Sequence, residues 1–190
     1  VFIQIEGRLL MILGLDVSTA ATGYCILSDD GSLVELDWIS LSKTKELVEK
    51  GFIFRDKIIS LIKKYPGIDK IYIEQAFQRY GAGMSSITRL ASFNGVVQYI
   101  CAEHFESIPG LISVSESRKL CGIKTMSKKK SGKDVKEQVF EWVDRHLKYD
   151  WPKKVLQSGP RKGLEITIPQ SRDMADAWVI AQAGFVKYKN

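Results

Sequence analysis

Short apolar runs separated by turn-forming residues mark the first part of the chain. Runs at residues 11–16, 22–28 and 33–39 predict three strands. A turn rich in Ser, Thr, Ala and Gly separates the first two, and Asp29-Asp30-Gly31 separates the second from the third. Because such short turns join neighbouring strands that run in opposite directions, we expect these three strands to be antiparallel.

Apolar residues at helical spacing follow these strands. Residues 43–65 carry Leu47, Phe54 and Ile58 on one face, which predicts a helix that ends at Pro66, because proline cannot continue a helix. A buried strand at 71–74 comes next, then a helix over 84–105 and a short strand at 111–114. A third helix is expected at about 135–147 and a last one from about residue 173, with a loop and a hairpin near 164–168 between them.

This order of elements predicts an α/β fold with one mixed five-stranded sheet flanked by helices. A helical crossover joins the first strand to the strand at 71–74, so these two should be parallel, whereas the first three strands should be antiparallel. The sequence contains no internal repeat and no interdomain linker, so residues 11–190 are interpreted as a single domain.

The first ten residues are interpreted separately. Ile5-Glu6-Gly7-Arg8 spells a protease site that is common in engineered fusion proteins, which favours an engineered or upstream leader over 1–10. The alternative is a native extra strand, because Phe2, Ile3 and Ile5 are strand formers.

The composition is that of a globular protein. The chain has 190 residues, of which 45% are hydrophobic. It contains no run approaching the roughly 20 apolar residues of a membrane span, and its start does not resemble a signal peptide. Cys25, Cys101 and Cys121 are widely spaced and odd in number, which favours reduced thiols in the cytoplasm over a zinc site or a disulfide framework.

The net charge of +6 favours a polyanionic partner, and the basic residues are clustered. Five lysines fall within residues 124–133, and four more basic residues follow soon after. The alternative is a solvated loop surface without a partner. The two groups are Lys124, Lys128, Lys129, Lys130 and Lys133, then Lys153, Lys154, Arg161 and Lys162.

Four carboxylates are placed where they can meet. Asp16 ends the first strand and Glu74 ends the strand at 71–74, so both lie at the same carboxyl edge if these strands are neighbours. Asp173 and Asp176 are three residues apart on the last helix and share one of its faces. Each acid also has a structural explanation by itself. Asp16 is a possible turn acceptor, Glu74 an exposed strand end, and the last two a helix start.

Converging carboxylates repel each other and need a compensating cation. Oxygen ligands without His or thiolate suit Mg²⁺, with Mn²⁺ as a substitute. Two such ions about 4 Å apart activate a water molecule and stabilise the leaving oxygen in phosphodiester hydrolysis. The four acids together therefore predict a two-metal nuclease site.

Three segments, in this order, resemble motifs of the RuvC-type Holliday junction resolvases. They are Ile12-Leu13-Gly14-Leu15-Asp16 with Thr22-Gly23-Tyr24, then Ile73-Glu74-Gln75-Ala76-Phe77, and finally Asp173-Met174-Ala175-Asp176-Ala177. The resemblance covers residues 11 to about 184. It implies a ribonuclease-H-like fold, a homodimer, and two-metal cleavage of four-way DNA junctions on symmetric strands. It also implies that the metal ligands are Asp16, Glu74, Asp173 and Asp176.

The resemblance extends to residues that contact DNA. Phe77 matches an aromatic residue that the family places against bases at the junction, and a place in the core is the alternative. Lys133 resembles a catalytic family lysine near the scissile phosphate, in a register that leaves a few positions open. Arg118 and Lys119 follow the short late strand and are expected to contact phosphate, as are the neighbouring Lys124, Lys128, Lys129 and Lys130.

The chain departs from the family pattern in two places. Val17-Ser18-Thr19 stands where the family usually has proline and glycine, and residues 149–170 form a longer connection than the family's. A divergent member, such as one encoded by a phage, fits these departures. The helix over 84–105, with small residues at Ala91 and Gly95, is the expected seam of a homodimer.

Three other functions remain open. The same chemistry could act on flaps, forks or RNA–DNA hybrids. An actin-like or sugar-kinase-like phosphotransferase is favoured by the first turn alone, but the chain has no second phosphate motif. A non-catalytic module that binds branched DNA would not require all four acids.

Overall fold

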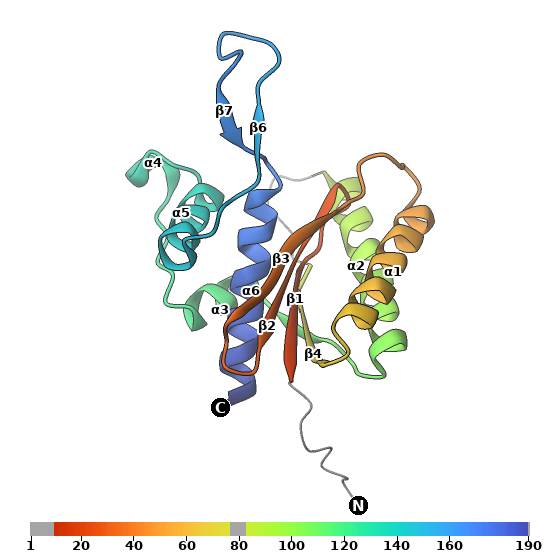
Figure 1. Ribbon diagram of the computed structural model, residues 1–190. Coiled ribbons are helices and arrows are strands. Elements are labelled where there is room, and N and C mark those ends of the chain that lie inside the picture. The colour runs from red at the N-terminus through yellow and green to blue at the C-terminus, as the bar shows by residue number, and fades with distance from the viewer. Residues whose placement is uncertain (1–9, 77–82, 190) are drawn as a thin grey trace, which may run out of the picture.

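The computed structural model describes residues 10–76 and 83–189 (Figure 1). Its main sheet contains β1 (Met11–Asp16), β2 (Ala21–Ser28), β3 (Leu33–Ser40), β4 (Ile68–Glu74) and β5 (Gly110–Ile112). The strand order is β3-β2-β1-β4-β5. β2 pairs antiparallel with both β1 and β3, whereas β4 pairs parallel with β1 and β5. The predicted mixed five-stranded sheet is confirmed.

Helices cover both faces of this sheet (Figure 1). On one face lie α1 (Leu47–Lys64) and α2 (Met84–Phe105). On the other lies α6 (Ser171–Lys189), accompanied by α3 (Val114–Leu120) and α5 (Val135–Leu147). Because side chains alternate along a strand, Leu13 and Leu15 of β1 pack toward α1 and α2, while Gly14 between them contacts α6.

Two apolar cores result from this arrangement. One joins the sheet to α1 and α2 and includes the fully buried Tyr24, Phe54 and Phe93. The other joins the sheet to α5 and α6 and includes Val143 and Met174. The sheet is therefore buried on both sides, and its strand ends are the part that remains open to a ligand. Cys25, Cys101 and Cys121 are free thiols.

Some boundaries differ from those expected. β4 begins at Ile68 rather than 71, and α1 begins at Leu47 rather than 43. Two short helices were not predicted: α3, and α4 (Lys128–Ser131). The sequence does carry a signal for α3, because Ser113 caps it and accepts a hydrogen bond from the backbone N–H of Glu116, at the spacing of a capping box.

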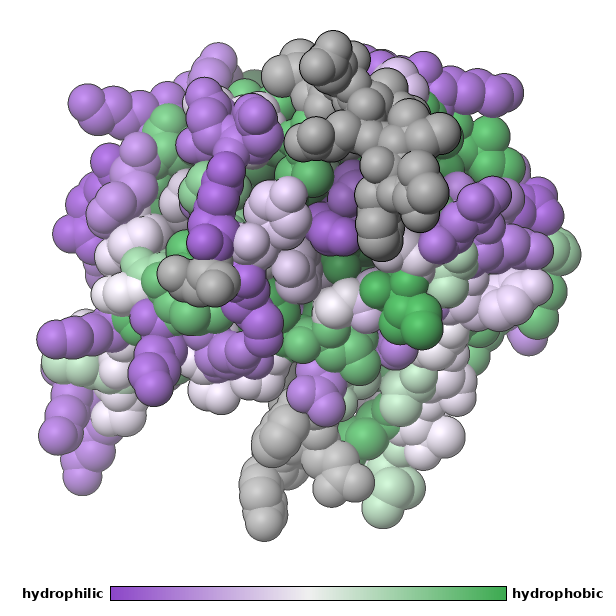
Figure 2. All heavy atoms as spheres, turned by 90° about the horizontal axis from the view of Figure 1, so that it is seen from below, coloured by the Kyte–Doolittle hydropathy of each residue, from purple (hydrophilic) through white to green (hydrophobic). Residues whose placement is uncertain are grey.

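The two ends of the molecule differ in shape. β1 and β4 run toward the end from which β6 (Lys153–Val155) and β7 (Glu165–Thr167) project as a hairpin (Figure 1). Figure 2 looks at the opposite end, where apolar side chains occur in scattered groups between hydrophilic ones.

Within the described ranges, none of the helices combines the length and apolar character that a membrane crossing requires.

Glycines allow α6 to lie against the sheet without intervening side chains. A Cβ added at Gly14 would lie 2.5 Å from the backbone nitrogen of Ala181, and one at Gly23 would lie 2.1 Å from the backbone oxygen of Asp173. Both obstacles are backbone atoms, so no side-chain rotation relieves the overlap. The backbone of α6 therefore touches β1 and β2 directly.

We expect Gly23→Ala to destabilise the protein by about 1–3 kcal/mol or more, the range found for overpacked cores. The added methyl group would push the start of α6 away from β2, and urea unfolding would measure the loss. Gly83→Ala is the matched control, because a Cβ there meets no atom of the described residues within 4 Å. Equal stabilities of the two variants would contradict the proposed contact.

Candidate active site

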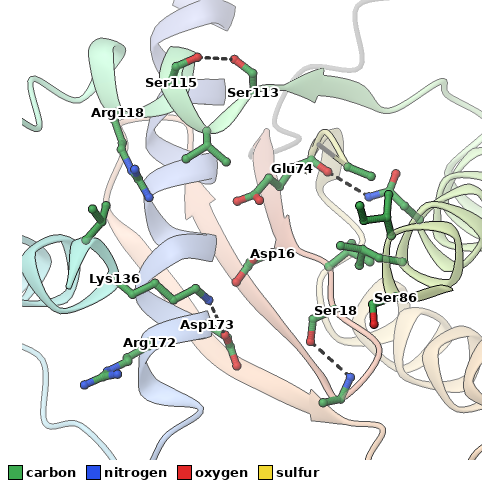
Figure 3. Close-up of a pocket in the computed structure, with 18 of the residues that line it drawn as sticks. Asp16, Ser18, Glu74, Ser86, Ser113, Ser115, Arg118, Lys136, Arg172 and Asp173 are labelled. Carbon is green, nitrogen blue, oxygen red and sulfur yellow. Dashed lines mark hydrogen bonds and ion pairs between the residues drawn. The ribbon is translucent and has the colours of Figure 1, made fainter. Parts of the chain in front are cut away.

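A cleft of about 1180 Å³ opens at the carboxyl ends of β1 and β4 (Figure 3). Its lining comes from these strands, from α2 and α3, and from the first turns of α5 and α6. Asp16, Glu74 and Asp173 all line it, and Asp176 lies one turn further along α6. Acids that are far apart in the chain are thus brought to one end of the sheet, as the strand connections predict.

Asp16 is the last residue of β1 and is only 6% exposed. Its Oδ2 atom is buried and has no hydrogen-bond partner among the described residues. The turn that follows is closed by Ser18, whose Oγ accepts from the Ala21 N–H at 3.1 Å and donates to the Ala21 carbonyl at 2.6 Å. Ser18 thus performs the turn-closing role considered for Asp16.

A side chain of α1 also fixes the turn that follows Asp16. Lys50 is 4% exposed, and its Nζ donates to the carbonyl of Thr19 at 2.7 Å and to the carbonyl of Leu41. These bonds tie the turn to the end of β3. Side chains therefore stabilise the Val17-Ser18-Thr19 segment, which lacks the proline and glycine expected from the family pattern.

Glu74 ends β4 and faces the same cleft (Figure 3). Its backbone carbonyl accepts from Asn94 Nδ2 at 3.0 Å, and Asn94 Oδ1 accepts from Gln98 Nε2 at 2.6 Å. Asn94 is 4% exposed and belongs to α2. This buried amide fixes the end of β4 to α2 and so sets where Glu74 emerges.

Lys136 lies between the two acids of α6. Its Nζ is 3.2 Å from Asp173 Oδ1 and 3.4 Å from Asp176 Oδ2. It stands on the first turn of α5, which is capped by Asp134 through a 2.8 Å bond from the Glu137 N–H. Since α6 begins at Ser171, Asp173 lies inside its first turn and does not act as the N-cap.

The acids are close enough to perturb one another. Burial, followed by the charges of Glu74 and Asp176, raises the pKa of Asp16 well above its ordinary value. Burial also raises the pKa of Asp176, although Lys136 and Arg118 oppose that shift. Burial lowers the pKa of Lys136, but the charges of Asp16 and Asp176 outweigh this effect and raise it. The site is therefore short of positive charge.

The donor set fits a hard divalent cation. The acids offer only oxygen ligands, and the unpartnered Oδ2 of Asp16 is a buried acceptor that a cation would satisfy. Within the described ranges, no three acid, His or Cys side chains already stand close enough to hold one ion. Lys136 lies between Asp173 and Asp176. For an ion to bind, the carboxylates of these two residues would therefore have to turn away from Lys136 and toward Asp16 and Glu74.

The other predicted residues are distributed around the cleft. Lys133 does not line it: this residue precedes the cap of α5 and pairs with Glu141 at the surface. Lys136, three positions later, lines the cleft instead, because the first turn of α5 faces α6. Arg118 lines the cleft and, with Lys119 and Lys124, an adjoining hollow of about 420 Å³.

Other predicted contacts lie further out or outside the description. Lys128, Lys129 and Lys130 form the exposed helix α4. Phe77 lies outside the described residues. Lys136 and Asn94 were not among the predicted site residues, because their roles depend on which faces of α5 and α2 turn toward the sheet edge.

Known proteins similar to this chain were found by sequence and by structure. No model of a protein family matches the chain. A crossover junction endodeoxyribonuclease RuvC of Sulfurovum sp. (strain NBC37-1) is 32% identical over 139 residues, covering 72% of this chain and 80% of that protein. A protein of the same description from Aliarcobacter butzleri (strain RM4018) is 26% identical over 137 residues, covering 72% and 82%. Among solved structures, Thermus thermophilus RuvC in complex with a Holliday junction substrate matches with a TM-score of 0.63 and 12% identity, over 95% of both chains.

The unfavourable burial of Asp16 predicts a pH-dependent effect on stability. Its folded pKa is raised, so ionisation destabilises the fold as the pH rises above about 3.8, the ordinary value. Asp16→Asn removes this cost, so with a chelator present the variant should melt above the wild type at pH 7. The difference should vanish as the pH falls toward 4. Each 1 kcal/mol recovered raises the Tm by roughly 2–4 °C.

The matched control for this effect is Asp69→Asn, because Asp69 is exposed at the start of β4. It should leave the melting temperature nearly unchanged at both pH values. A lower Tm for Asp16→Asn than for the wild type at pH 7 would mean that the Asp16 carboxylate stabilises the fold.

Proposed function

Because the chain belongs to the RuvC family of crossover junction endodeoxyribonucleases, we propose that it is a metal-dependent nuclease that cleaves four-way DNA junctions. The observation that carries this proposal is the gathering of Asp16, Glu74 and Asp173 around one cleft. Family membership gives the reaction class, and the cleft gives the residues that would perform it.

We propose that Asp16, Glu74, Asp173 and Asp176 hold two Mg²⁺ ions, with Mn²⁺ as a substitute. The support is the all-oxygen donor set and the raised pKa of Asp16, which a nearby cation would reverse. When bound, such ions activate a water molecule and stabilise the leaving oxygen of the phosphodiester. The chain's own contribution is a rigid sheet edge from which the acids project.

Basic residues around the acids are suited to bind the DNA backbone. Lys136 pairs with two of the acids, and its ammonium group would be available to the scissile phosphate if bound cations neutralised those acids. Arg118 offers a second cation on the cleft wall. We retain Phe77 as the residue that stacks on a base at the junction, because it follows Glu74 by three positions.

We further propose that the protein acts as a homodimer through α2. Phe93, Val97 and Cys101 bury one face of this helix, whereas Met84 and Tyr99 are 76% and 65% exposed on another. Gly95 lies on the exposed side, and a Cβ added there meets no atom within 4 Å in the part of the chain that the structure describes. A second α2 could approach closely at this glycine. Two sites related by a twofold axis would produce paired cuts on symmetric strands.

We expect the protein with Mg²⁺ to cut a four-way junction in preference to a Y-fork, a flap, an RNA–DNA hybrid and a linear duplex. Asp16→Asn and Glu74→Gln should each lower the cleavage rate by more than about 100-fold, because even outer partners of metal ligands cost 10–100-fold. Both variants should still bind the junction, since phosphate contacts supply most of the affinity.

Asp69→Asn is the matched control for these two variants and should cut at the wild-type rate, because its carboxylate lies at the far end of β4. Preferential cutting of flaps, forks or hybrids would replace the proposed substrate while keeping the chemistry. Full activity of Asp16→Asn would overturn the assignment of the active site.

The dimer proposal predicts that Gly95→Arg yields a monomer. A long charged side chain at the closest approach of the two helices would separate them, and sedimentation velocity at micromolar concentration would detect the change. Val48→Arg is the matched control, since Val48 is 66% exposed and belongs to a different helix, α1. A dimeric Gly95→Arg protein would exclude α2 as the seam.

A further inference from the structure

The hairpin formed by β6 and β7 has no part in the site described above. It projects beyond the body of the protein at the end where β1 and β4 terminate (Figure 1), and the cleft opens at these strand ends. All four of its basic residues are exposed, and so are Val155 and Leu164, at 49% and 54%. Two-stranded hairpins are only marginally stable alone, so contact with a partner would stabilise this one.

The hairpin is nevertheless ordered, because its base is anchored in the core. Trp151 is 6% exposed, packs 4.8 Å from the ring of Phe140 and 5.1 Å from that of Tyr149, and donates to Asp144 Oδ1 at 2.7 Å. The Ile168 N–H donates to the Pro152 carbonyl at 2.9 Å and closes the base. The hairpin is thus a supported arm and not a loose loop.

Backbone hydrogen bonds extend this order to the tip. The strands continue beyond β6 and β7 through bonds in both directions between Leu156 and the 163–164 segment, at 2.9 and 3.0 Å. At the turn itself, the Lys162 N–H donates to the Gly159 carbonyl at 3.0 Å. Gly159 and Gly163 adopt φ values of +80° and +87°, which glycine accepts without strain. The tip therefore presents its side chains in a defined place.

The charge of the hairpin is strongly one-sided. Residues 152–168 contain four basic residues and one acid, so they hold half of the chain's net charge of +6. Lys153 pairs with that acid, Glu165, at 3.5 Å. Within the described part of the chain, no carboxylate lies within ion-pair distance of the other three, Lys154, Arg161 and Lys162.

We propose that this hairpin is a phosphate-binding arm that grips one duplex arm of the DNA beside the cleft. The proposal rests on the proposed nuclease function. Unpaired cations on a ribbon that projects past the catalytic end would meet the DNA backbone before or as the junction enters the cleft. The contacts are electrostatic and independent of base sequence, so the arm adds affinity and orientation without sequence preference.

The test replaces Lys154, Arg161 and Lys162 together with Gln and measures junction binding by fluorescence anisotropy without divalent cations. Each phosphate contact contributes about 0.9 to the slope of log K against log salt, so the slope should fall by about 2–3. At 0.15 M salt the Kd should rise on the order of 10–100-fold. A second variant, Arg161→Glu with Lys162→Glu, should weaken binding as well.

The matched control replaces three exposed or partly exposed lysines near the opposite end, Lys63, Lys70 and Lys189, with Gln. It carries the same loss of net charge, and its Kd should stay within about threefold of the wild type. An equal loss of junction affinity in both triple variants would mean that only the net charge matters, and it would overturn the proposed phosphate-binding arm.

The two proposals fail in distinguishable ways. If the wild type cuts junctions and the hairpin variants bind them with unchanged Kd and salt slope, the arm is overturned and the nuclease stands. If the wild type neither binds nor cuts branched DNA, the nuclease function is overturned. If the hairpin variants lose the dimer in sedimentation, the hairpin is an interface between two copies and not a DNA-binding arm.

Discussion

The mutual repulsion of carboxylates in a partly dry cleft is the constraint on which the rest of this structure depends. Asp16 is buried without a partner for one of its oxygens, and Glu74 and Asp176 add to the cost of its charge. Such an arrangement lowers stability unless a cation is present. The surrounding structure must therefore hold the acids in place against their own electrostatics.

Several features of the fold supply that support. The acids Asp16 and Glu74 end two hydrogen-bonded parallel strands, so the sheet itself sets their separation. Asp173 belongs to the first turn of α6, where the positive end of the helix dipole favours a carboxylate. Lys136 reaches in from α5 and partly neutralises the α6 acids. Each of these contributions comes from a different element, which explains why residues far apart in the chain are needed to build the site.

The sequence predicts the sheet and the four acids better than it predicts their surroundings. Strand direction follows from turn length and from the helical crossover, which are local features, so the positions of Asp16 and Glu74 could be deduced. The position of Lys136 could not, because it depends on which face of α5 turns toward α6. Lys133 precedes the cap of α5 and Lys136 lies on its first turn, so the lysine that enters the cleft depends on where the helix begins and how it packs on α6. Likewise Asn94 is recognisable as a support for β4 only when α2 is seen against the strand.

The direct contact between α6 and the sheet has a consequence for how sequence variation in this protein should be interpreted. Gly14 and Gly23 set the spacing between the layer that carries Asp16 and the helix that carries Asp173 and Asp176. A substitution at either glycine would shift one set of acids relative to the other while leaving every acid intact. Inactive homologues could therefore keep a complete set of acidic motifs, and a survey that scores only those motifs would misclassify them as working enzymes. The glycines deserve the same weight as the carboxylates in such a survey.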